Sequence, residues 1–177
     1  MLGAVATATG VMLALSGCGM PGIPIGHERG ADAAPASSID CLSEPSSRWL
    51  EDPQATEAPV LHPLPGRVPD RFEPAAALLC ELPSPPADAR DATVAVTRFD
   101  GDLGALLEAL DAPDDVAGPG QMCTADMQLV PSLWLEADDG TLIPVHWPRD
   151  ACGKTKPDAD EELEKLKPGT TIEVPLS

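Results

Sequence analysis

The fold is decided by residues 128–147, QLVPSLWLEADDGTLIPVHW, which have the form of a β-hairpin. The runs Gln128–Glu136 and Leu142–Trp147 are rich in apolar and β-branched residues, and this composition predicts two strands. The segment Ala137–Gly140 between them ends in Asp-Gly, a pair suited to the positive φ of a tight hairpin turn. Residues 128–147 therefore predict two antiparallel strands.

The chain before this hairpin predicts a strand followed by a helix. Ala92–Phe99, ATVAVTRF, is rich in β-branched residues and predicts a strand. Asp100–Asp102 then supplies a turn and a helix N-cap. Leucines at 103, 106, 107 and 110 have the spacing of one apolar helix face, and we expect this helix to end near Asp111.

The flanking segments complete the predicted architecture. Proline is abundant from Pro45 to Pro86, which predicts irregular chain that ends in a short strand at Ala75–Leu82. After the hairpin, Asp158–Leu166 predicts a short acidic helix, Pro168-Gly169 its end, and Thr171–Val174 a last strand. The order β-β-α-β-β-α-β indicates an α+β domain with a small, mostly antiparallel sheet and two short helices.

The N-terminus carries the pattern of a lipoprotein signal peptide. Met1–Gly17 contain no charged side chain and form an apolar run too short to span a bilayer, which needs about 20 residues. Leu15-Ser16-Gly17-Cys18 matches the bacterial lipobox, so residues 1–17 resemble a signal peptide that is cut before Cys18. By this resemblance Cys18 carries a diacylglyceryl group, which anchors the protein to the extracytoplasmic face of the cell membrane.

Two other interpretations of this segment stay open: an ordinary secretory signal, or a buried apolar helix in which Cys18 is incidental. The segment also departs from the usual pattern, because a signal peptide begins with positively charged residues and here only the initiator amine is positive. Either the true start lies upstream of Met1 or this signal is unusually bare.

The remaining four of the five cysteines are Cys41, Cys80, Cys123 and Cys152. Their even number, in a chain argued to be exported to an oxidising compartment, predicts two disulfides. Zinc is the competing hypothesis, but there is no C-x-x-C, and the histidines are not near the cysteines as ligand pairs. Three pairings are possible. We favour Cys41–Cys80 with Cys123–Cys152, because sequential pairing links each half of the domain to itself.

Composition divides the chain into segments and excludes one class of partner. Residues 18–40 are predicted to be the lipidated N-terminus and a flexible tether rich in Gly, Pro, Ala and Ser. Residues 41–177 then form a single extracytoplasmic domain. The net charge of −18 disfavours nucleic acid, which requires a basic patch, and it also repels anionic headgroups. The expected membrane contact is therefore the lipid on Cys18.

Acidic residues suggest metal sites, but each group has a simpler explanation. Asp138 and Asp139 lack the D-x-D-x-D-G loop of a calcium site, and their place in a turn accounts for both. The acidic residues from Asp158 to Glu164 are expected to form a solvated helix face. We predict no metal site and no cofactor.

A hydrolytic site could be assembled from His146, Asp150 and Ser132. Ser132 lacks the G-x-S-x-G elbow of a serine nucleophile, however, and no other motif supports a triad. An outward-facing histidine on a hairpin strand is the simpler interpretation of His146. We predict no catalytic residue.

The tryptophans are Trp49, Trp134 and Trp147. Trp134 and Trp147 lie on the two predicted hairpin strands. We expect them to pack in the core or across the strands, rather than to serve as exposed binding anchors.

Three stretches resemble segments of small uncharacterised lipoproteins and secreted proteins of high-GC Gram-positive bacteria. They are Val96–Leu103, Leu133–Leu135 with Asp139-Gly140, and Trp147–Lys154. The resemblance implies a location on the outer face of the cytoplasmic membrane and carries no activity.

These patterns favour a non-enzymatic, membrane-anchored binding or interaction module in the cell envelope. Its ligand would be a protein, a peptide or a cell-wall component. One alternative is an envelope hydrolase whose site is assembled from scattered residues. Another is a solute-receptor component, which the small size and the lack of two similar lobes disfavour.

The lipobox hypothesis predicts that Cys18→Ser abolishes incorporation of a clickable fatty acid into the protein in growing cells. The substitution removes the thiol that the thioether link requires. Equal labelling of the wild type and the variant, measured after immunoprecipitation, would contradict lipidation at Cys18.

Overall fold

The computed structural model describes residues 30–43, 62–81, 93–126 and 128–175. Its elements follow the predicted order of five strands and two helices. They are β1 (Pro74–Cys80), β2 (Thr93–Asp100), α1 (Gly104–Leu110), β3 (Leu133–Ala137), β4 (Leu142–Val145), α2 (Pro157–Glu164) and β5 (Lys167–Pro175). The chain thus has the predicted α+β fold.

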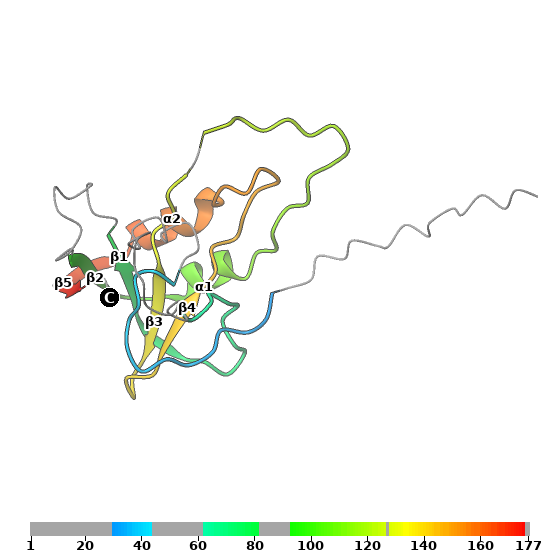
Figure 1. Ribbon diagram of the computed structural model, residues 1–177. Coiled ribbons are helices and arrows are strands. Elements are labelled where there is room, and N and C mark those ends of the chain that lie inside the picture. Colours follow the sequence, from blue (N-terminus) through cyan, green and yellow to red (C-terminus); the bar gives the residue numbers. More distant parts are fainter. Residues whose placement is uncertain (1–29, 44–61, 82–92, 127, 176–177) are drawn as a thin grey trace, which may run out of the picture.

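The strands form one sheet with the order β4-β3-β1-β2-β5, and every neighbouring pair is antiparallel. The predicted hairpin forms one side of this sheet as β3 and β4. β1 lies at the centre, with β2 and β5 on its other side (Figure 1). The sheet is therefore completed by pairing between segments far apart in the sequence.

The hairpin turn forms where the sequence predicts it. Gly140 has a φ of +83°, which glycine adopts without a steric penalty. The amide of Thr141 donates to the Asp139 carboxylate at 2.9 Å, which fixes the turn. The first strand is shorter than predicted, since β3 begins at Leu133 and not at Gln128. Pro131, just before it, has no backbone donor for a ladder.

The C-terminal segment corrects another prediction. The predicted helix Asp158–Leu166 already ends at Glu164, and β5 begins at Lys167, so Pro168 and Gly169, predicted to end the helix, belong to the strand. A β-carbon at Gly169 would lie 2.7 Å from Oδ2 of Asp100, so a larger residue there would require the Asp100 carboxylate to move. The last strand consequently extends well beyond the predicted Thr171–Val174.

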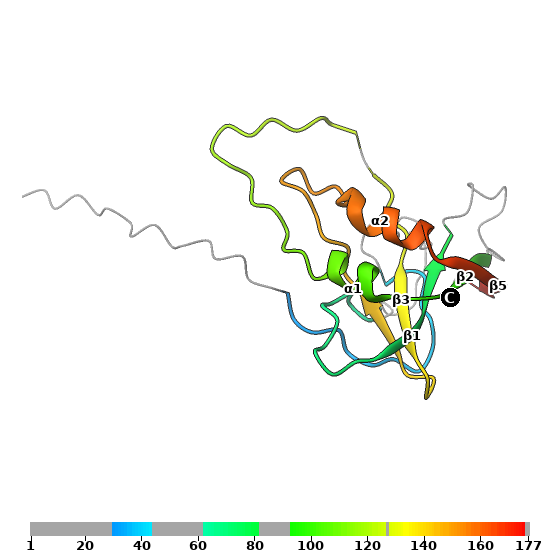
Figure 2. The same ribbon diagram turned by 180° about the vertical axis from the view of Figure 1, so that it is seen from behind.

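Both helices cover the first face of the sheet, where the larger core lies (Figures 1 and 2). The N-cap of α1 is Leu103, without a side-chain cap hydrogen bond, and not one of the predicted residues Asp100–Asp102. Just before it, the side chain of Asp102 accepts a hydrogen bond from the amide of Gly104 at 3.0 Å, which belongs to the predicted turn. The helices contribute buried apolar side chains that meet those of the hairpin. This core includes Leu106 and Leu110 of α1, Ala159 and Leu163 of α2, and Leu133, Leu135, Ile143 and Val145 of the hairpin.

The N-terminal segment, residues 30–43, which we call the strap, covers the second face of the sheet with Ala36, Ile39 and Cys41, while Ala33 joins the core under the helices. A disulfide between Cys41 and Cys80 fixes the strap to β1. Ala36 donates its amide to the carbonyl of Leu142 at 2.8 Å, which places the strap along β4. Residues 30–40 were predicted to belong to a flexible tether, but this packing makes them part of the folded domain.

The two tryptophans of the hairpin region are buried, as predicted, but not as a cross-strand pair. Trp134 is 0% exposed and belongs to the core under the strap, with Cys41, Leu78 and Cys80. Trp147 is 1% exposed and belongs to the core under the helices. The two indoles therefore lie on opposite faces of the sheet. Trp49 lies outside the described residues.

Replacing Leu135 with alanine should test the importance of the core under the helices. Leu135 is 0% exposed, and we expect a loss of about 2–5 kcal/mol in the free energy of unfolding from the cavity and the lost burial. Leu64 is 67% exposed, and Leu64→Ala is the matched control, with a change below about 0.5 kcal/mol. Urea denaturation with intact disulfides measures both. Equal effects would contradict the assigned core.

Candidate functional site

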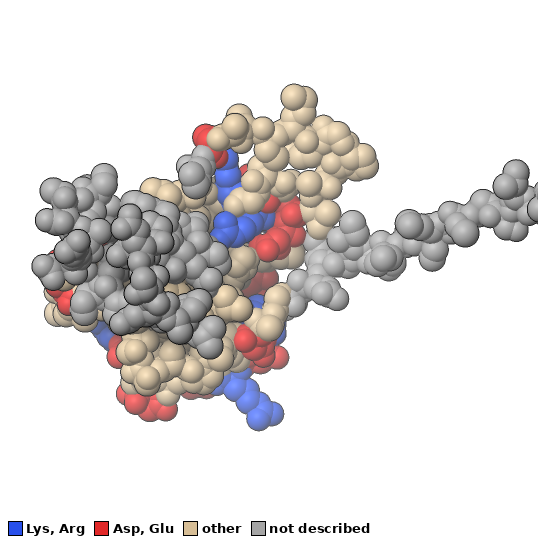
Figure 3. Space-filling view, viewed as in Figure 1, with Lys and Arg blue, Asp and Glu red and all other residues tan. Residues whose placement is uncertain are grey.

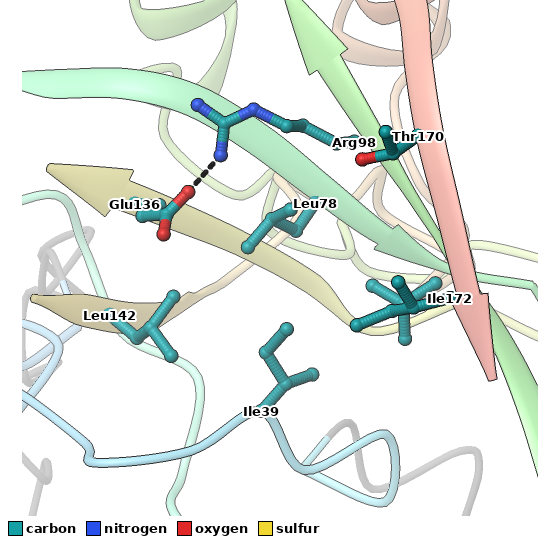
Figure 4. Close-up of a pocket in the computed structure, with 8 residues that line it drawn as sticks. Ile39, Leu78, Arg98, Glu136, Leu142, Thr170 and Ile172 are labelled. Carbon is teal, nitrogen blue, oxygen red and sulfur yellow. Dashed lines mark hydrogen bonds and ion pairs between the residues drawn. The ribbon is translucent and has the colours of Figure 1, made fainter. Parts of the chain in front are cut away.

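A groove with a volume of about 200 Å³ crosses the second face of the sheet beside the strap. All five strands and the strap contribute to it, and most of the side chains are apolar. The lining residues are Ile39, Leu78, Val96, Arg98, Glu136, Leu142, Thr170 and Ile172. Figure 4 shows Ile39 reaching from the strap towards Leu78, between Leu142 and Ile172. We call this feature the sheet groove.

An ion-paired arginine marks one end of the sheet groove. Arg98 donates from Nε to Oδ1 of Asp100 at 2.8 Å, and from Nη1 to Oε2 of Glu136 (Figure 4). The side chains of Arg98 and Glu136 are 31% and 28% exposed, so both ions are only partly solvated. Two carboxylates on one guanidinium give this end an excess of one negative charge. A cationic group of a ligand would be attracted to it.

The sheet groove is more open at β5 than at β4. At the β4 end, the strap pairs with Leu142 and covers the strand. At the β5 end, Ile172 is 54% exposed and Thr170 is exposed.

The three residues of the hypothetical hydrolytic site have different partners. Ser132 is 2% exposed, and its hydroxyl donates to the carbonyl of Cys41 at 2.8 Å. His146 instead lies beside Asp114, with Nε2 3.0 Å from Oδ2. The Asp150 carboxylate accepts two backbone amides of its own loop at 2.8 and 2.9 Å. The structure therefore does not bring these residues together as a triad.

The acidic groups considered as metal sites have structural roles. The hydrogen bond from the Thr141 amide lowers the pKa of Asp139, as expected for a turn aspartate that is ionised in the fold. In α2, partial burial raises the pKa of Asp160. Within the described residues, no group of three His, Cys, Asp or Glu side chains could hold a metal ion.

The second disulfide, Cys123–Cys152, links two surface loops as the favoured pairing predicted. Near it, Lys154 forms an ion pair with Asp126. The hydrogen bond from Lys154 is the main cause that lowers the pKa of Asp126 to about 2. This cluster is exposed and polar, which is typical of a loop contact and not of a ligand site.

The sheet groove itself was not predicted from the sequence. Alternate side chains of a strand share a face, so Val94, Val96 and Arg98 of ATVAVTRF lie on one face of β2. This pattern of two valines followed by an arginine was the feature of the sequence that could have indicated a groove with a polar end. No sequence pattern indicated that Ile39 lines the groove, because its position depends on the packing of the strap and on the disulfide of the strap. Comparisons with protein-family models, with curated proteins and with solved structures gave no match.

The Lys154–Asp126 pair predicts a specific titration. Because the folded pKa of Asp126 is depressed, the pair's contribution to stability is present above the ordinary carboxyl pKa and is lost as the pH falls towards about 2. Lys154→Met should raise the pKa of Asp126 towards its ordinary value, as measured by NMR of the side-chain carboxyl. Lys165→Met, which removes the partner of Glu162, is the control. An unchanged pKa in Lys154→Met would contradict the assignment.

Proposed function

We propose that this chain is a membrane-anchored extracytoplasmic lipoprotein and that its folded domain is a binding module of the cell envelope. The sheet groove is the observation that carries the proposal. It combines an apolar floor, a charged end and an exposed side at β5, which are the features of a surface that holds a partner. The ligand class is a protein, a peptide or a cell-wall component.

The anchoring part of the proposal is supported by the lipobox at Leu15–Cys18, which lies outside the described residues. The other four cysteines are bonded to one another in the two disulfides, which is the state expected in an oxidising compartment. None of the helices among the described residues is long and apolar enough to cross a membrane. With a net charge of −18 repelling anionic headgroups, lipid is the membrane contact that the composition favours.

A binding role is favoured over hydrolysis because of what lines the groove. Its polar side chains are Arg98, Glu136 and Thr170, and the first two are bonded to each other. Ser132, the nucleophile considered from the sequence, is buried against the carbonyl of Cys41 and does not line the groove. The groove therefore offers recognition chemistry, an apolar surface with a charged end, and no pair of nucleophile and base.

The volume of the groove indicates the size of the ligand that it can hold. Sites for whole small molecules usually have volumes of about 300–1,000 Å³, and this groove has about 200 Å³. A volume of that size accommodates one or two side chains of a larger partner. The proposal therefore favours a macromolecular ligand over a free solute, and it disfavours the solute-receptor alternative.

Crosslinking in intact cells tests the binding role. A photoreactive amino acid at Thr170, which lines the groove, should yield a defined adduct, whereas the same residue at Met122, 91% exposed on a loop, should not. Adding Ile172→Asp should reduce the Thr170 adduct at least about fivefold, because a charge in the apolar floor opposes burial.

The control for this experiment is the folded state of each variant, measured by circular dichroism. Ile172 is 54% exposed, so the aspartate should leave the fold intact. Equal adducts from Thr170 and Met122, or an adduct indifferent to Ile172→Asp, would show that the groove is not the binding site.

A further inference from the structure

The two edges of the sheet differ in how they are covered. The outer side of β4 is covered by two bridges, from Ala36 to Leu142 and from Gly66 to Val145. The outer side of β5 has no partner strand in the described part of the chain. An edge strand presents unpaired backbone donors and acceptors, and natural proteins usually protect such edges. β5 is therefore the edge at which another strand can be added.

The backbone direction along β2 follows from one hydrogen bond. Glu81, just after β1, donates its amide to the carbonyl of Ala95 at 2.7 Å, so the backbone groups of Ala95 point towards β1. In an antiparallel sheet these groups alternate in direction along each strand. The backbone groups of Val94 and Val96 therefore point the opposite way, towards β5.

The register then fixes which groups of β5 are available. Val94 and Val96 pair with Val174 and Ile172, so the backbone groups of these two β5 residues point inward. By the same alternation, the backbone groups of Thr171 and Glu173 point away from the sheet. Glu173 is exposed, and β5 has a neighbouring strand on one side only among the described residues. The C-terminal half of β5 thus offers a short ladder for an incoming strand.

The side chains of β5 connect this edge with the sheet groove. Thr170 and Ile172 line the groove, and Val174 packs against the same core under the strap. A strand added along β5 would place every second side chain on the same face. Those side chains would extend the apolar surface of the groove, and the intervening ones would lie beside Glu173.

We propose that the occupant is an extended segment of a partner polypeptide, with alternating apolar and basic residues, that adds to β5 as a sixth strand. Its backbone would pair with Thr171 and Glu173, and its apolar side chains would lie against Ile172 and the groove. This inference rests on the proposed binding function and adds the chemical class of the partner.

Charge favours a basic partner over a second copy of this chain. The net charge of −18 makes pairing of two copies repulsive, whereas it attracts a cationic segment. Locally, Glu173 of β5 is exposed on the face that would carry the basic side chains of the added strand. Figure 3 shows one face of the described part of the chain, with its Asp and Glu side chains and its Lys and Arg side chains.

The test uses the full chain in detergent and a fluorescent, end-capped octapeptide that alternates Lys and Val. Fluorescence anisotropy should show saturable binding of this peptide, and no binding of a Glu-Val counterpart. Glu173→Pro removes the backbone amide that points outward from β5. It should weaken peptide binding about tenfold, which is equivalent to ~1.4 kcal/mol and lies in the range of one hydrogen bond. Glu173→Ala keeps the amide and is the matched control, with a loss of only about twofold from the missing surface charge.

The peptide supplies a second test that leaves the protein unchanged. N-methylation of alternate peptide amides should weaken binding when it falls on the residues that donate to β5, and should have little effect on the other set. Equal weakening by Glu173→Pro and Glu173→Ala, or equal effects of the two methylated sets, would overturn strand addition. Sedimentation that shows a dimer dissociated by Glu173→Pro would overturn it too, because the occupant would be a second copy.

The experiments distinguish failure of strand addition from failure of the proposed binding function. If Ile172→Asp removes the Thr170 adduct in cells while Glu173→Pro leaves it intact, the groove binds a ligand that is not a β-strand, and this inference is wrong. If neither variant changes the adduct, the proposed binding function fails as well.

Discussion

The disulfide between Cys41 and Cys80 holds the strap against the second face of the sheet. Helices α1 and α2 bury the first face, whereas on the second face Leu78, Val94, Val96 and Trp134 form a core that, in the described part of the chain, is covered by the strap. The bond joins residues 39 apart in the sequence, which restricts the unfolded chain and stabilises the fold by about 2–4 kcal/mol in the usual case. Without it, the strap would depend on a few backbone bridges to stay in place.

Incomplete covering of the second face produces the site. The strap reaches from Cys41 past Ile39 to the outer side of β4, so the β4 edge is covered, while β5 has no such bridge among residues 30–43, 62–81, 93–126 and 128–175. The sheet groove forms where Ile39 approaches Leu78, and it opens towards Ile172. Apolar surface, an open strand edge and an ion-paired arginine therefore meet at one end of the sheet. Under the proposed lipid anchor, this surface would face partners in the cell envelope.

Much of the fold could be predicted because its signals are local. The Asp139-Gly140 turn, the leucine spacing of α1 and the β-branched run of β2 each depend on neighbouring residues only. The disulfide pairing was also predictable, since sequential pairing keeps each bond within one half of the chain. The errors concern long-range packing. Residues 30–40 have the composition of a tether, but the sheet and the disulfide order them.

The site was harder to predict for the same physical reason. The sheet groove joins the strap to all five strands, and strand order is not encoded in any single segment. The hypothetical triad failed because Ser132 is oriented by Cys41 O and His146 by Asp114, contacts across 91 and 32 residues. The tryptophans illustrate this as well, because alternation along β3 assigns Trp134 and its neighbours Leu133 and Leu135 to opposite faces.

Amide hydrogen exchange of the full chain, with and without the Lys-Val peptide, tests the central claim most directly. The claim is that the ligand binds along the open edge of β5 beside the sheet groove. It predicts that the outward amides of Thr171 and Glu173 exchange rapidly in the free protein and become protected on binding, while amides of β4 and α2 do not change. Protection confined to α2 or to the loop around Cys123, with β5 unchanged, would contradict the claim.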